Sequence, residues 1–157
     1  MKTGCEAQGQ RQKVIDFLRR PKEIESVIWR KEETIAELKS CLLPQSAKYR
    51  EGGSTSLSTD RTGDIMAKVD GIEAELEQLK KKRAAAILDI YQTVEMLENE
   101  TERKVITAIY IKGVTHSKAA EETGYSLRHV DRIQKKGLEH LEEIIEEPGT
   151  FGGDNMA

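Results

Sequence analysis

The chain has 157 residues and a formal net charge of −3, with 34% charged and 37% hydrophobic residues. Two Phe and one Trp are too little bulky apolar material for a thick sheet-based core, and three Pro leave room for long helices. Cys5 and Cys41 show neither a disulfide framework nor a zinc-ligand spacing, so we expect two free thiols. The composition therefore favours an all-α protein.

The first residues and the overall hydropathy predict where the protein is located. Residues 1–12 lack an apolar run, so no signal peptide is expected. No window reaches the ~18 apolar residues of a membrane span. We expect a soluble, cytoplasmic protein without a membrane partner, with flexible tails at residues 1–12 and 148–157.

Residues 13–43 have the pattern of a first helix. Pro21 interrupts the pattern and predicts a separate short helical turn before it, and Pro44 ends the segment. Lys31 lies on the apolar stripe, whose other members follow 4-7-3-4 spacing: Ile24, Ile28, Ile35, Leu38 and Leu42. Residues 44–63 are rich in Ser, Thr and Gly and predict a flexible loop.

A second long helix is predicted from about Asp64. Its stripe alternates four and three residues, which is the signature of a coiled-coil seam: Ile65, Val69, Ile72, Leu76, Leu79, Arg83, Ala86, Ile90, Thr93 and Leu97. Residues 13–100 therefore predict an antiparallel coiled-coil hairpin of two long helices. The spacing leaves open whether the seam closes within one chain or between chains.

Residues 101–147 predict a three-helix domain. The first helix covers residues 102–112 and ends at Gly113. Thr115 caps a second helix that reaches Thr123, and Gly124 supplies a tight turn. Ser126 caps a third helix that continues to residue 147. Two short helices joined by a glycine turn predict a helix-turn-helix, which binds double-stranded DNA.

The third helix has separate inner and outer faces. We expect the inner positions to be Ala119, Thr123, Tyr125, Val130 and Ile133. Residues 126–137 carry a net charge of +3, whereas residues 138–147 contain five Glu and no Lys or Arg. The segment 126–137 is therefore the predicted recognition helix in the major groove.

Individual contacts follow from position along this helix. Backbone amides of Ser126, Leu127 and Arg128 at the helix start can meet a phosphate. Arg128 is the best candidate to contact a guanine edge, and Arg132 follows one turn later. Further predicted DNA contacts, mainly to phosphate, are His116, Lys118, His129, Lys135 and Lys136.

The segment ERKVITAIYIKGVTHSKAAEETGYSLRHVDRIQKKGLEHL resembles the sigma-70 region 4-like domain of small phage and prophage proteins of the RinA/ArpU type. The most specific match is the string GYSxRHVxR. Relatives of this type are late-transcription regulators, which implies a bacterial host cytoplasm and adds host RNA polymerase as a candidate partner. Ala119 and Thr123 depart from the family pattern, which often has a larger aliphatic side chain at the first position.

Parts of the sequence pattern are also compatible with other functions. The three histidines lack carboxylate or cysteine partners at ligand spacing, and no phosphate-binding loop is present, so we expect no enzyme, no cofactor and no metal. A small terminase-like packaging protein also couples a helix-turn-helix to an oligomerising helical region. A helical interaction protein that binds no DNA is the third possibility. We expect the chain to form a homo-oligomer, because a single small domain rarely gives useful operator affinity and a half-exposed seam needs covering.

Overall fold

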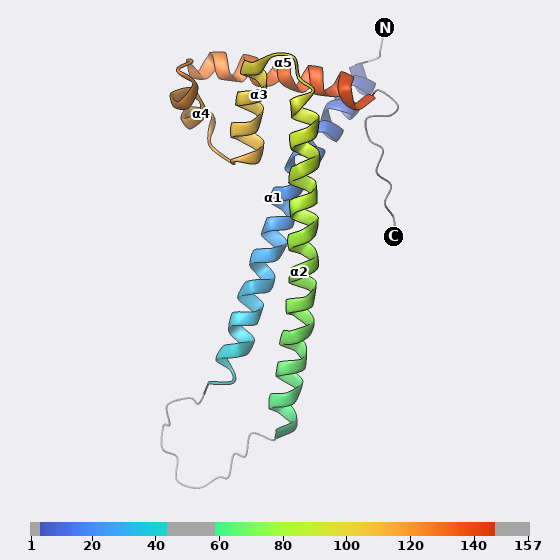
Figure 1. The fold of residues 1–157 in the computed structure, drawn as a ribbon, viewed down its shortest axis with the longest axis vertical. Helices are drawn as coiled ribbons and strands as arrows, with labels where there is room; N and C mark the ends of the chain where they lie inside the picture. Colours follow the sequence, from blue (N-terminus) through green and yellow to red (C-terminus); the bar gives the residue numbers. More distant parts are fainter. Residues whose placement is uncertain (1–3, 44–58, 147–157) are drawn as a thin grey trace. The chain divides into compact units, whose positions relative to one another are not determined.

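The computed structural model describes residues 4–43 and 59–146 (Figure 1). Within these ranges the chain is helical, without a β-strand, and confirms the predicted all-α fold. The elements are α1 (Gly4–Ser40), α2 (Thr59–Glu95), α3 (Glu100–Ile106), the π-helical turn η1 (Thr107–Ile111), α4 (His116–Thr123) and α5 (Leu127–Glu146). Most of the predicted loop 44–63 and the predicted tail 148–157 lie outside the described residues. None of the described helices has the length and apolar content needed to cross a membrane.

The contacts divide the chain into two compact units. One unit comprises Lys22–Arg83, and the other combines Met1–Pro21 with Ala84–Ala157. The sequence placed a boundary near residue 100 instead. The difference arises because the first turns of α1 and the last turns of α2 pack against the C-terminal helices, a long-range contact that local periodicity does not encode.

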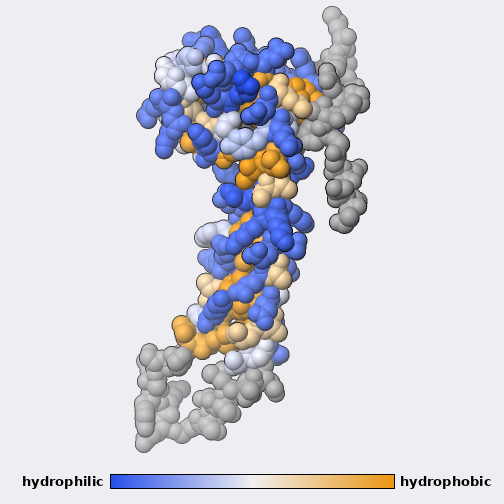
Figure 2. Space-filling model, viewed as in Figure 1, coloured by the Kyte–Doolittle hydropathy of each residue, from blue (hydrophilic) through white to orange (hydrophobic). Residues whose placement is uncertain are grey.

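In the unit Lys22–Arg83, α1 and α2 form the predicted hairpin. Its core is the predicted stripe, with Ile28 and Ile35 of α1 buried against Val69 and Leu76 of α2. Partly buried neighbours on the same stripe complete it: Ile24, Leu38, Ile65, Ile72 and Leu79. Figure 2 shows apolar atoms along this part of the molecule with hydrophilic atoms beside them. In this structure the two stripes pack against each other within one chain.

Ion pairs across the hairpin show that its helices are antiparallel. Glu25 pairs with Arg83 at 3.1 Å, Glu32 with Lys80 at 3.5 Å, and Lys39 with Glu73 at 3.1 Å, so that rising numbers in α1 meet falling numbers in α2. Lys31, the polar member of the α1 stripe, pairs with Glu75. These side chains are largely exposed, and each such pair adds only ~0–1 kcal/mol. Burial of the apolar stripe is therefore the main stabilising contribution.

Three local predictions about these helices were wrong. Pro21 does not interrupt α1 but lies buried inside it. Proline cannot donate the helical hydrogen bond, but Pro21 and Leu18, one turn before it, are both buried, so tertiary packing holds this part of α1 helical. The predicted tail at residues 1–12 is helical from Gly4 onward, and α2 begins at Thr59, within the predicted loop.

The second unit has a core that draws on distant parts of the sequence. Val14 and Leu18 of α1 are buried with Ile90 and Val94 of α2. Ile106 of α3 and two α5 residues, Leu138 and Leu141, join the same cluster. A second cluster lies among α3, η1, α4 and α5: Val105, Ala108, Ala119, Val130 and Ile133. The C-terminal helices thus share one of their two cores with α1 and α2.

This shared core gives a first prediction. Leu18→Ala removes a side chain that is 1% exposed and should lower the free energy of unfolding by about 2–5 kcal/mol. Trp29→Ala is the matched control, because Trp29 is 63% exposed on the same helix and should change stability by less than about 0.5 kcal/mol. Urea unfolding followed by circular dichroism measures both. Equal effects of the two substitutions would contradict the shared core.

Candidate nucleic-acid interface

The helix-turn-helix is built from capped short helices, as the sequence predicted. The Thr115 hydroxyl accepts a hydrogen bond from the Lys118 N–H at 3.3 Å and caps α4. Gly124 ends α4 with a φ of 75°, a left-handed conformation that favours glycine. The Ser126 hydroxyl accepts from the His129 N–H at 3.3 Å at the start of α5. The turn between α4 and α5 is therefore fixed by local chemistry.

The helix that precedes this pair differs from the prediction. One α-helix was expected over residues 102–112, but α3 ends at Ile106 and continues as the π-helical turn η1. The Lys112 N–H bonds to the Thr107 carbonyl at 3.0 Å, which is the wider π spacing. Asn99 caps α3 by accepting from the Thr101 N–H at 2.9 Å. The predicted end at Gly113, with a φ of 69°, agrees with the structure.

The inner face of α4 and α5 matches the prediction at most positions. Ala119 and Val130 are fully buried and Ile133 is 8% exposed. Thr123 is half-buried, and its hydroxyl donates to the Ala119 carbonyl at 2.7 Å. Tyr125 was predicted inside, and this was wrong: it is 40% exposed, with its ring edge-on to His129 at a centroid distance of 4.9 Å. Tyr125 lies in the turn, so helix periodicity does not fix its direction.

The outer face of α5 presents the predicted DNA-binding residues to solvent. Leu127 is 48% exposed. Ser126 and His129 are exposed, as are the four basic side chains Arg128, Arg132, Lys135 and Lys136. Lys118 of α4 is also exposed. Because Val130 and Ile133 hold the opposite face of the helix in the core, this basic face is fixed outward.

His116 was predicted as a phosphate contact, and the structure gives it internal partners. Its Nε2 lies 2.7 Å from the Gln134 side-chain oxygen, and the Gln134 amide donates to the Tyr110 hydroxyl at 2.9 Å. Asp131 lies at 4.0 Å from the same ring nitrogen. The network joins η1, α4 and α5 and holds the recognition helix against its neighbours. Sequence reasoning missed it, since the only local signal was one Gln beside the basic residues of the third helix.

A buried carboxylate links α3 to α5. Glu102 is 3% exposed, and one of its carboxylate oxygens lies 2.7 Å from the His140 Nδ1. This hydrogen bond raises the pKa of His140 above its usual value, with further help from the charges of Glu143 and Glu139, while partial burial opposes the shift. The protonated ring therefore pairs with Glu102 and tethers the two helices.

The two helices approach closely beside this pair. A Cβ built on Gly137 would lie 3.0 Å from the Ile106 Cγ1, so glycine lets α5 pack directly on α3.

The acidic end of α5 contacts α1. The Arg11 guanidinium of α1 contacts both Glu139 and Glu142 at 3.1 Å. The acidic half of α5 thus holds α1, and the basic half remains available to solvent.

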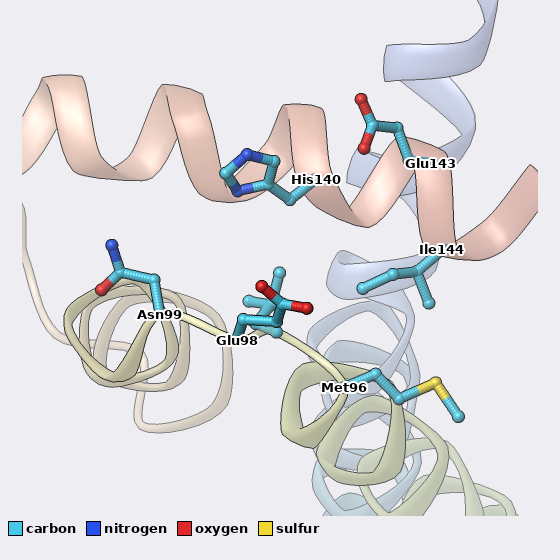
Figure 3. Close-up of a pocket in the computed structure, with 7 residues that line it drawn as sticks. Met96, Glu98, Asn99, His140, Glu143 and Ile144 are labelled. Atoms are coloured by element: carbon cyan, nitrogen blue, oxygen red, sulfur yellow. The ribbon is translucent and has the colours of Figure 1, made fainter.

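The unit that combines Met1–Pro21 with Ala84–Ala157 also contains a shallow cavity beside His140. Its volume is about 390 Å³, and it lies between α5 and the turn that connects α2 to α3 (Figure 3). His140, Glu143 and Ile144 line it from α5, opposite Met96, Leu97, Glu98 and Asn99. The described residues include no cluster of His, Cys, Asp or Glu that could hold a metal ion. The cavity is a mixed polar and apolar hollow next to the Glu102–His140 pair.

Comparison with known proteins identifies the domain. Residues 99–143 match the family model described as Sigma-70, region 4, which covers less than a third of the 157-residue chain. No curated protein and no solved structure matches the chain. Residues 99–143 are therefore a sigma-70 region 4-like, DNA-binding helix-turn-helix, and they contain α3, η1, α4 and most of α5.

The Glu102–His140 pair predicts a pH dependence of stability. Because the pKa of His140 is raised in the folded state, its stabilisation is complete below the unfolded value near pH 6.5 and is lost as pH rises through the folded value. The effect should be modest, since the His140 side chain is 51% exposed.

Urea midpoints between about pH 5.5 and 8.5 test this prediction. Wild type should exceed His140→Gln at acidic pH, and the difference should shrink as pH rises. His129→Gln is the control, because His129 has no carboxylate contact among the described residues. A difference that grows with pH would contradict the assignment.

Proposed function

We propose that the chain is a sequence-specific regulator of late transcription encoded by a phage or prophage, which acts on DNA in the cytoplasm of a bacterial host. The region 4-like match supports DNA binding, and the GYSxRHVxR string supports the particular type of regulator. The chain is proposed to act without catalysis, cofactor or metal.

The observation that carries the DNA-binding role is the exposed basic face of α5. Arg128, Arg132 and Lys135 recur on one side of the helix, opposite the buried Val130 and Ile133. Only a helix with its inner face fixed in a core can present a constant set of side chains to base edges. The basic face therefore enters the major groove, with the start of α5 nearest the bases.

Roles within this face follow from chemistry and position. Arg128 is the first basic residue of α5, and its guanidinium can bind guanine O6 and N7 together. Lys135 and Lys136, two turns later, hold phosphates as point charges. Lys118 and His116 add phosphate contacts from α4, where His116 can use only the ring nitrogen that does not face Gln134.

The hairpin is proposed to provide self-association or contact with host RNA polymerase. Small single domains rarely give useful operator affinity, and a dimer would bind two half-sites about one helical turn, ~34 Å, apart. DNA selected from a random library should then contain paired copies of one short element. Recovery of a single unpaired element would favour a monomer that gains affinity through polymerase.

Arginine and lysine substitutions separate base contact from phosphate contact. Arg128→Ala should weaken the preferred site by ~1–3 kcal/mol and leave random-sequence binding nearly unchanged. Lys135→Ala should weaken all sequences alike and lower the salt slope by about one unit. Fluorescence anisotropy at several salt concentrations measures both.

The control for general charge effects is Lys68→Ala, an exposed lysine of the hairpin, which should change neither quantity. Equal losses on specific and random DNA with Arg128→Ala would show that α5 does not contact bases as proposed. Absence of DNA binding by the wild type at low salt would favour an interaction protein. A ring-shaped oligomer would favour a packaging protein.

A further inference from the structure

The outward side of α2 carries a second periodic stripe that the hairpin does not use. Lys81, Ala84, Leu88, Tyr91 and Glu95 follow 3-4-3-4 spacing along this helix, so they share one face. None of them belongs to the hairpin stripe. All five are exposed, including the large apolar side chains Leu88 at 57% and Tyr91 at 42%.

This stripe is complementary to itself when a second copy is placed antiparallel to it. With a two-fold axis through Leu88, the two Leu88 side chains meet. Lys81 then lies opposite Glu95 of the other copy, because each is seven residues from Leu88. Tyr91 lies beside the small Ala84 of the other copy, so that a large side chain faces a small one.

The charges at the two ends favour this occupant over an unrelated helix. Neither Lys81 nor Glu95 has an ion-pair partner among the described residues, whereas nearby Lys80 and Arg83 pair with α1. In the antiparallel pair, Lys81 of each copy faces Glu95 of the other copy, so the two-fold symmetry gives two ion pairs. A parallel pair would instead place Lys81 against Lys81 and Glu95 against Glu95.

We propose that two copies of this chain associate through the α2 stripe Lys81, Ala84, Leu88, Tyr91 and Glu95, antiparallel and two-fold symmetric about Leu88. Such an isologous contact forms a closed dimer. Four helical turns bury less than a standard interface, so the association is expected at micromolar concentrations. The inference names the surface for the self-association proposed above, and its test requires no DNA.

Sedimentation equilibrium of the full chain measures the association. The wild type should dimerise, and Leu88→Glu should abolish the dimer while helicity is kept, since the position is exposed and Glu is a good helix former. Met66→Glu is the matched control: Met66 is 44% exposed on the same helix but lies about four turns before Lys81, beyond the end of the stripe, and its substitution should leave the dimer intact.

Charge reversal tests the antiparallel register. Lys81→Glu and Glu95→Lys should each weaken self-association by roughly tenfold, because like charges then face each other twice. A mixture of these two variants should form heterodimers at wild-type strength, since every facing pair is again opposite in sign. The double variant Lys81→Glu/Glu95→Lys should also dimerise like the wild type.

Either of two results would overturn the inference: a wild type that is monomeric up to millimolar concentration, or a dimer that survives Leu88→Glu. Failure of the mixture to restore association would also overturn it. A dimer that binds no DNA would rule out the proposed regulatory function but not the proposed α2 dimer surface. If the chain binds DNA and its self-association is insensitive to Leu88→Glu, only the proposed α2 dimer surface is ruled out.

Discussion

Burial of Leu138 and Leu141 of α5 against α1 and α2 is the contact on which the DNA-binding domain depends. A helix-turn-helix of short helices has little apolar surface of its own, and small domains bury too small a fraction of their surface to be very stable. Here Val14, Leu18 and Ile90 supply the missing core from outside residues 99–143. The folding unit of the DNA-binding domain therefore extends beyond residues 99–143, which are the residues that the family model matches.

This arrangement divides α5 into two halves with different tasks. The half that begins at Leu127 has a buried side toward α4 and an exposed basic side. The half that ends at Glu146 packs on α1, where Arg11 contacts Glu139 and Glu142. The negative charge of the whole chain is thus compatible with DNA binding, because acidic residues are used in helix contacts and the basic ones are concentrated on one face.

The sequence predicted the features that local chemistry determines. Thr115, Gly124 and Ser126 set the helix ends, and the 4-3 stripes set the hairpin seam, because capping and periodicity act over a few residues. The sequence did not predict that Pro21 lies inside a helix, or that Tyr125 is exposed. It also missed the Glu102–His140 pair and the Arg11 contacts. These last two depend on residues far away in the chain, and a single sequence gives no signal for such pairings, whereas Tyr125 lies in a turn where helix periodicity does not apply.

Mapping of backbone amide shifts by NMR tests most directly whether the start of α5 and the start of α4 contact DNA. Addition of a DNA duplex selected for binding should shift amides of residues 115–118 and 126–136 most strongly. The hairpin residues 65–79 should shift little. The largest shifts in the hairpin, with residues 126–136 unchanged, would contradict the assignment of α5 as the recognition helix.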